Sequence, residues 1–170
     1  MELLINKTDV EKYFQVAIGR NDAEFEKYIR QAQMFDLKKI MPEMFFYDLL
    51  KNKAEANYQK VINGDEYVYE ENEYEQEGLK AVLAHFTYGL YIFKSNIQDT
   101  SFGMVVKQSQ QSDPVEYKER RDWYYEHKSQ ANQIWEDIKR FIERNIDDYP
   151  VWTECTTVRD RRTFKTKLIQ

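Results

Sequence analysis

The sequence of 170 residues contains little cysteine, glycine, proline or histidine, with one Cys, five Gly, three Pro and two His. The single Cys155 excludes an internal disulfide and a cysteine-rich metal site. No apolar run approaches the length that crosses a bilayer, and residues 1–7 turn polar too soon for a signal peptide. We therefore expect a protein made in the cytoplasm, with no membrane among its partners.

Motifs that carry chemistry are also missing. His85 and His127 lack the HxxxH or HExxH spacing of a zinc site, and the acids of residues 65–77 lack the spacing of a calcium loop. There is no glycine-rich phosphate loop and no GxSxG motif. We expect His85 to be a partly buried, hydrogen-bonded side chain and His127 to lie on the polar part of a helix. The sequence predicts a protein that is not an enzyme and needs no cofactor or metal.

The composition indicates a mainly α-helical fold. Apolar residues make up 42% and charged residues 32%, a balance typical of a folded, helix-rich domain, and the length suits a single domain. We predict a bundle of five to six helices over residues 1–150, including a long C-terminal helix. A short hairpin or loop is expected near residues 96–112, and an extended basic tail over residues 151–170.

Apolar spacing predicts four helices in the first part of the chain. Thr8 and Glu11 have the form of a capping box for a helix that reaches about Val16. A second helix restarts at Asn21 or Asp22 and ends before Pro42, which can take the first position of the third helix. The expected core face of the second helix is Phe25, Tyr28, Ile29, Ala32, Phe35 and Ile40. Phe45 and Leu49 anchor the third helix, and the fourth covers residues 54–62 and stops at Asn63-Gly64.

The middle of the chain changes from acidic to apolar. In residues 65–77, Tyr67, Tyr69 and Tyr74 alternate irregularly with carboxylates, and we interpret this segment as an ordered loop. Beyond Gly78 comes the central helix, which reaches Lys94. Its expected core stripe is Leu79, Val82, Leu83, Phe86, Leu90 and Phe93.

The longest helix is predicted from Pro114 to Ile146, with Asp113 as its cap and Glu116 as the capping-box acid. At about 1.5 Å per residue it would span about 50 Å, so it must kink or protrude. Its second half carries the core stripe Ala131, Ile134, Trp135, Ile138, Phe141 and Ile142, whereas Arg120 and His127 occupy that phase earlier.

Three consecutive aromatic residues of this helix cannot all face one core. Trp123, Tyr124 and Tyr125 cover about 200° of the helix surface, at about 100° per residue. We therefore expect at least one of them to contact a partner, and we single out Trp123 and Tyr125.

Charge is segregated along the chain despite a net charge of −5. Residues 63–79 contain seven acids and no base, among them Glu70, Glu71, Glu73 and Glu75. Residues 159–170 contain five bases and one acid. The bases are Arg159, Arg161, Arg162, Lys165 and Lys167. The two segments could orient neighbouring copies, or could simply be two solvated surfaces.

The basic tail allows two kinds of partner. Five bases could bind nucleic acid weakly and in a salt-dependent way. Because the protein as a whole is acidic, docking to a protein is favoured, and we expect residues 152–170, including Trp152, to order only against a partner.

Several features follow one another along the chain. They are a short capped helix, a long helix carrying Ala32-Gln33-Met34-Phe35-Asp36-Leu37, a short apolar helix, Asn63-Gly64, Gly78-Leu79-Lys80, Phe102-Gly103-Met104-Val105, a long helix, and Tyr149-Pro150-Val151-Trp152. Taken in order, they resemble the head-to-tail connector, or adaptor, proteins of tailed bacteriophages. The resemblance spans nearly the whole chain and is closest to versions from Bacteroides-infecting phages, including crAss-like phages. The acidic segment between Asn63 and Leu79 departs from the commonest connector pattern.

The resemblance implies a structural virion protein located in the phage neck. It implies a ring, commonly of twelve copies, that joins the portal of the capsid to a downstream neck or tail protein and leaves a channel for DNA. The acidic segment would then line the channel, repelling DNA without sequence-specific binding, or lie on the outside. The alternatives are a nucleic-acid-binding regulator, a helical adaptor unrelated to virions, and another ring of the same neck, a stopper or tail terminator.

Overall fold

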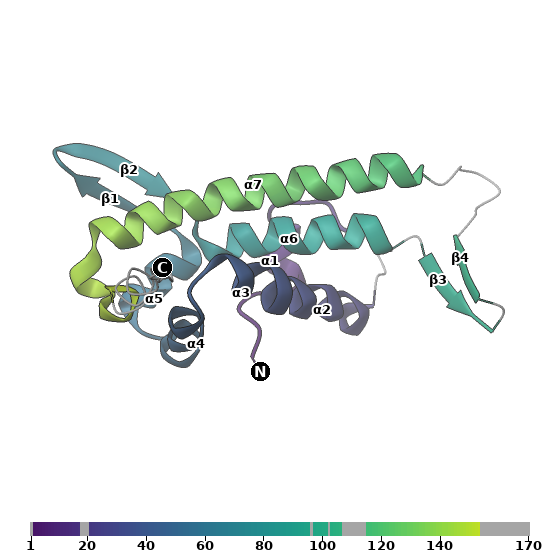
Figure 1. The fold of residues 1–170 in the computed structure, drawn as a ribbon, viewed down its shortest axis with the longest axis horizontal. Coiled ribbons are helices and arrows are strands. Elements are labelled where there is room, and N and C mark those ends of the chain that lie inside the picture. The colour runs from purple at the N-terminus through teal and green to yellow at the C-terminus, as the bar shows by residue number, and fades with distance from the viewer. Residues whose placement is uncertain (1, 18–20, 96, 102, 107–114, 154–170) are drawn as a thin grey trace, which may run out of the picture.

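The protein is a helical body with a two-stranded hairpin at each end (Figure 1). The computed structural model describes residues 2–17, 21–95, 97–101, 103–106 and 115–153. These residues contain seven α-helices, of which α2 and α3 are joined without a break by a π-helical segment, η1. The helices therefore form six rods, and the predicted mainly α bundle is confirmed.

The first helix, α1, covers Lys7–Glu11 and begins earlier than predicted. The capping box is made by Asn6 and Asp9 rather than by Thr8 and Glu11. The Asp9 amide donates to Asn6 Oδ1 over 3.0 Å, and the Asn6 amide donates to Asp9 Oδ2 over 3.2 Å. An amide side chain caps as well as a hydroxyl does, so this start loses no capping energy. The helix ends at Glu11, short of the predicted Val16.

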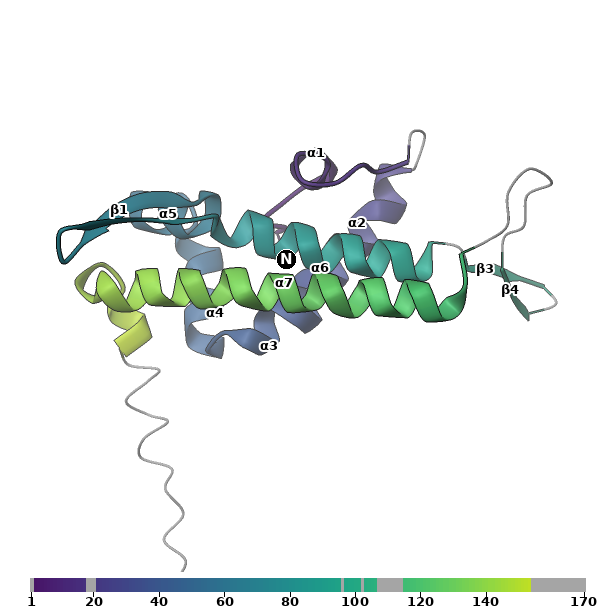
Figure 2. The same ribbon diagram turned by 90° about the horizontal axis from the view of Figure 1, so that it is seen from above.

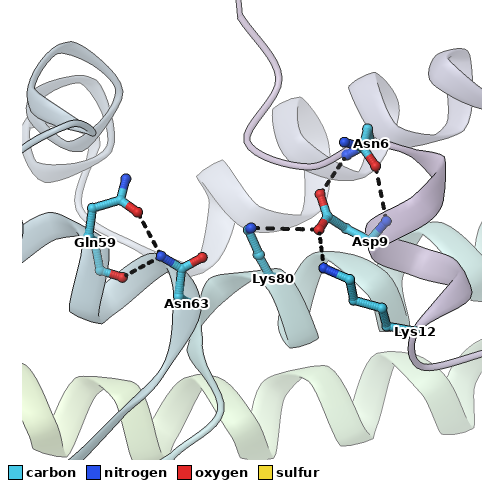
Figure 3. A network of polar contacts seen from close by, with 6 residues as sticks. All are labelled: Asn6, Asp9, Lys12, Gln59, Asn63 and Lys80. Carbon is cyan, nitrogen blue, oxygen red and sulfur yellow. Dashed lines mark hydrogen bonds and ion pairs between the residues drawn. The ribbon is translucent and has the colours of Figure 1, made fainter.

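Asp9 also ties α1 to the rest of the body (Figure 3). Lys12 donates to its carboxylate over 3.1 Å, and Lys80 lies 3.6 Å away on α6. Burial opposes ionisation of Asp9, but these lysines and the Asn6 amide together lower the pKa of its carboxyl. In the same view, the Asn63 side-chain amide donates to the carbonyl and side-chain oxygens of Gln59.

The second rod consists of α2 (Asp22–Gln31), η1 (Ala32–Leu37) and α3 (Lys38–Ile40). Its start is as predicted, with Asn21 accepting from the Ala23 amide over 2.9 Å. The predicted core face holds for Phe25, Ile29 and Ala32, which are buried.

Phe35 is an exception, because 69% of it is exposed. A π-helical turn holds more residues than an α-helical one, so η1 rotates Phe35 away from the core. Asp36 and Leu37 take the buried positions. The Asp36 carboxylate is balanced there by Lys128 of α7, whose ammonium group lies 2.7 Å away. The predicted assignment of Phe35 to the core is therefore wrong.

Helices α4 (Glu43–Asn52) and α5 (Ala56–Asn63) close one end of the body. Pro42 stands just before α4 as its N-cap, one position earlier than predicted. Phe45 and Leu49 have no exposed surface, which confirms them as the anchors of α4. As predicted, α5 stops at Gly64, whose φ of 97° suits glycine.

Helices α6 (Gly78–Lys94) and α7 (Tyr117–Arg144) run antiparallel, side by side, through the body (Figure 2). Helix α6 also contacts α1, α2, η1 and α5, so its predicted central place is confirmed. Its predicted stripe is buried except at Phe93, which is half-buried. On α7, Ala131, Trp135, Ile138, Phe141 and Ile142 are buried as predicted, and Ile134 is half-buried.

Helix α7 is shorter than predicted, because Glu116 is its N-cap and it ends at Arg144. The predicted Asp113 cap and Pro114 lie outside the described residues. Its 28 residues span about 42 Å, against about 25 Å for the 17 residues of α6. The C-terminal part of α7 that extends beyond α6 is covered by a hairpin (Figure 1), so the helix neither kinks nor projects bare into solvent at that end.

That hairpin is the acidic segment, which is not the predicted loop. Strands β1 (Asp65–Tyr69) and β2 (Asn72–Gln76) pair antiparallel, and Glu70 and Glu71, both with positive φ, form the turn. The half-buried positions of β1 alternate with exposed ones, the period expected of a strand with one covered face. The second hairpin, β3 (Ile97–Thr100) and β4 (Gly103–Val106), lies within the predicted 96–112 region.

The described chain ends on the core. After the 3₁₀ turn η2 (Ile146–Asp148), residues 150–153 are helical. Trp152 is only 3% exposed, and its ring lies 5.1 Å from that of Phe45 and 6.1 Å from that of Trp135. Trp152 is therefore a core residue rather than part of a docking arm. The predicted boundary at residue 151 falls too early, since Val151 is half-buried and Trp152 belongs to the core.

Candidate functional site

The inner face of the β1–β2 hairpin is fixed to α7 by one arginine and three tyrosines. The Arg144 guanidinium lies 4.0 Å from the Tyr74 ring centroid, 4.7 Å from that of Tyr69 and 5.9 Å from that of Tyr67. Arg144 also donates to the Tyr67 hydroxyl over 3.0 Å. Phe141 packs edge-on against Tyr67 at 4.9 Å. Because one guanidinium contacts three rings that stand on both strands, these cation–π contacts hold the hairpin in a defined orientation.

The outer face of the same hairpin is acidic and exposed. It carries Glu66 and Val68 on β1 and Glu73 and Glu75 on β2, and 69% of Val68 is exposed. Glu66 stands directly opposite Glu75 in the strand register. A shallow hollow of about 540 Å³ is lined by residues 66–68 and 73–75. The predicted Glu70 and Glu71 are exposed at the turn.

The N-terminal half of α7 exposes the aromatic residues that the sequence singled out. Trp123 is 43% exposed and Tyr125 is 60% exposed, while Tyr124 packs 5.5 Å from Phe93. Trp123 and Tyr125 are therefore exposed to solvent on different sides of the helix, as their separation of about 200° around its axis requires. Large aromatic side chains on a rigid helix suit protein interfaces. That they contact a partner remains a prediction.

Three further exposed apolar side chains were not predicted. They are Phe35 on η1 and Met44 and Tyr47 on α4, of which Met44 is 54% and Tyr47 48% exposed. Lys38, the first residue of α3, links the rod that contains η1 to α4, since its ammonium group donates to the Tyr47 hydroxyl over 3.1 Å. The exposure of Phe35 depends on the π-helical turn, which no spacing in the sequence revealed.

The two histidines of the chain meet between α6 and α7, although each was considered separately in the sequence. Their Nδ1 atoms are 3.3 Å apart, and Phe14 packs edge-on against both rings. His127 is half-buried rather than on a polar face. Gly89 permits the close approach, because a Cβ there would lie 3.2 Å from His127 Cβ. Residues 42 positions apart gave no local signal of this pair.

The pKa values of both imidazoles are lowered. Burial, and then the neighbouring His127, lower the pKa of His85 to about 4. Burial also lowers the pKa of His127, against the opposing charge of Glu126. In the unfolded chain both pKa values return to about 6.5.

We expect this pair to make the fold sensitive to acid. Below pH 6.5 the unfolded chain binds protons that the folded histidines resist, so the free energy of unfolding falls as the pH drops from about 6.5 to about 4. Discounted for partial exposure, the loss is roughly 1–2 kcal/mol. Urea denaturation of the wild type and of His85→Asn/His127→Asn at several pH values measures it. The double variant should show a smaller loss over this window, and an equal loss would contradict the prediction.

The structure does not describe the other residues that the sequence singled out in the tail. Arg159, Arg161, Arg162, Lys165, Lys167 and Cys155 lie outside the described residues. Among the described residues there is no group of three or more His, Cys, Asp or Glu side chains arranged to hold a metal ion. In the same part of the chain, no helix combines the length and apolar character needed to cross a membrane.

Residues 37–162 match the model of a family of unknown function, DUF6712. The chain belongs to this family. The DUF6712 region begins at the last residue of η1 and contains both hairpins, α6 and α7, and it reaches the first bases of the tail. No curated protein and no solved structure matches the chain.

Proposed function

We propose that this DUF6712 protein is a structural subunit of the neck of a tailed-phage virion. It forms a ring between the capsid portal and a downstream neck or tail protein, with a central channel for DNA. Twelve copies is the number that the resemblance to head-to-tail connectors implies. The role is mechanical rather than enzymatic.

One observation carries this proposal: Trp123 and Tyr125 are exposed on different sides of α7. Each copy in a ring touches two neighbours through two different patches, because the contact is head-to-tail. A rigid helix with an aromatic residue on each side supplies two such patches. The exposed side chains of Phe35 on η1 and of Met44 and Tyr47 on α4 offer further contacts.

Negative-stain electron microscopy of the purified protein, with and without the neighbouring portal protein, tests the proposal. We expect closed rings, alone or stacked on the portal. The variant Trp123→Ala/Tyr125→Ala should lose the rings but keep its fold, since both side chains lie outside the core. Tyr13→Ala, which trims an exposed aromatic residue near α1, is the matched control and should keep them.

The other outcomes separate the alternatives. Monomers under both conditions would contradict the ring and favour a helical adaptor unrelated to virions. Salt-dependent DNA binding at physiological ionic strength would favour a nucleic-acid-binding regulator. Rings that persist in the double variant would support ring formation but show that the contact between copies uses surfaces other than Trp123 and Tyr125.

A further inference from the structure

The outer face of the β1–β2 hairpin carries charge that the described chain does not balance. Glu66 and Glu75 face each other across the strands, and Glu73 lies beside them opposite Val68. Like charges directly opposite one another destabilise a strand pair. Within the described residues none of these three carboxylates forms an ion pair, in contrast to Asp65, which lies 3.3 Å from Lys60. The face is therefore suited to a cationic partner.

The hairpin also has strand edges to which another strand could pair. The described part of its sheet consists of β1 and β2 alone, so each strand has an outer edge that pairs with no further strand there. Such edges bind extended segments through backbone hydrogen bonds. The Arg144 cluster beneath the hairpin fixes its orientation before any partner arrives, which lowers the entropic cost of binding.

The C-terminal segment of the chain has the matching pattern. In residues 161–168, Arg161, Thr163, Lys165 and Lys167 alternate with Arg162, Phe164, Thr166 and Leu168. In an extended strand the first set would share one face and the second set the other. Threonine, phenylalanine and leucine also make the segment compatible with a strand. Its net positive charge is opposite to that of the hairpin face.

We propose that residues 161–168 of one copy add as a third strand to the β1–β2 hairpin of a second copy. Lys165 and Lys167 then lie over the carboxylates of the outer face, and backbone hydrogen bonds form along the edge. The inference rests on the proposed ring, in which each copy donates one surface and receives another. The tail would be the surface that each copy donates and the hairpin the surface that receives it, because the two carry opposite charge.

Complementation between two full-length variants tests this contact. The hairpin variant is Glu66→Gln/Glu73→Gln/Glu75→Gln, and the tail variant is Arg161→Gln/Lys165→Gln/Lys167→Gln. Glu119→Gln/Glu126→Gln/Glu143→Gln removes the same charge from exposed positions of α7 and is the matched control. Sedimentation velocity at low and physiological salt measures self-association of each protein and of an equimolar mixture of the first two variants.

We expect the hairpin and tail variants each to weaken self-association about tenfold, as the loss of several cross-strand charge pairs predicts. The control should associate like the wild type. Mixed together, the two variants should form a heterodimer, because one retains the hairpin face and the other the tail. Added salt should weaken self-association of the wild type, and it should weaken self-association of the control to the same extent.

Three results would overturn the inference. Unchanged association of both variants would show that neither surface is used. A mixture that fails to pair, after each variant has lost association, would separate hairpin and tail into unrelated contacts. Monomeric wild type in which the tail is protected from protease by its own hairpin would place the contact within one chain. If both variants associate like the wild type and the wild type still forms rings by microscopy, the strand contact between hairpin and tail is wrong and the proposed ring is not.

Discussion

Replacing Trp152 with alanine is expected to destabilise the protein by about 3–5 kcal/mol, the usual cost of removing a large buried aromatic side chain. The indole is 3% exposed and packs edge-on against Phe45 at 5.1 Å and near Trp135 at 6.1 Å. Helices α4 and α7 and the end of the described chain thus meet at one side chain. Its loss leaves a cavity that three separate elements would have to close.

Trp123→Ala is the matched control for this prediction. Trp123 is 43% exposed on α7, so its removal should change the free energy of unfolding of the isolated protein by no more than about 1 kcal/mol. Urea denaturation followed by circular dichroism measures both variants. Equal stabilities for the two would mean that Trp152 does not belong to the core and would return it to the docking tail.

Replacing Gly78 with alanine is expected to cost about 3 kcal/mol or more, because it combines backbone strain with a steric clash. Gly78 has a φ of 81°, and a Cβ there would lie 2.3 Å from the Gly64 nitrogen. The chain enters the hairpin at Gly64 and leaves it at Gly78, and the two backbone segments are in contact there. Gln76 stabilises this contact. Its side-chain oxygen accepts from the Gly78 amide, and its side-chain nitrogen donates to the Lys60 carbonyl, each over 2.8 Å.

Gly103→Ala separates strain from clash. Gly103 also has a positive φ, 116°, but a Cβ there meets nothing within 4 Å. The cost should therefore be the backbone term alone, about 1–2 kcal/mol. Thermal and urea unfolding compare the two variants. A Gly78→Ala protein as stable as Gly103→Ala would show that the backbone contact between Gly64 and Gly78 relaxes easily and that the hairpin is not fixed at its base.

Regular helices were predictable because their evidence is local. The stripe from Leu79 to Leu90 on α6 and the stripe from Ala131 to Ile142 on α7 repeat every three or four residues, and both are buried except at the half-buried Ile134. The stop at Gly64 and the start after Asn21 follow from the chemistry of helix ends. For residues 96–112 the sequence predicted a short hairpin or a loop, and residues 97–106 form the hairpin.

Elements that depend on distant partners were missed. Tyr67, Tyr69 and Tyr74 form a strand face only because Arg144 and Phe141 of α7 lie beneath them. In the sequence, the same tyrosines stand among carboxylates that suggested a loop. The alternation of Tyr67 and Tyr69 with Glu66 and Val68 was the available signal, and it covers only one strand.

The sequence by itself determined the helical class, the order of the rods and the opposite charges of hairpin segment and tail, since composition and spacing act over a few residues. Only the tertiary structure decided that Phe35 is exposed, that Trp152 is buried and that His85 meets His127. Each of these depends on contacts between segments far apart in the chain, and such contacts outweigh the local preference of any one residue, because a core packs as a whole.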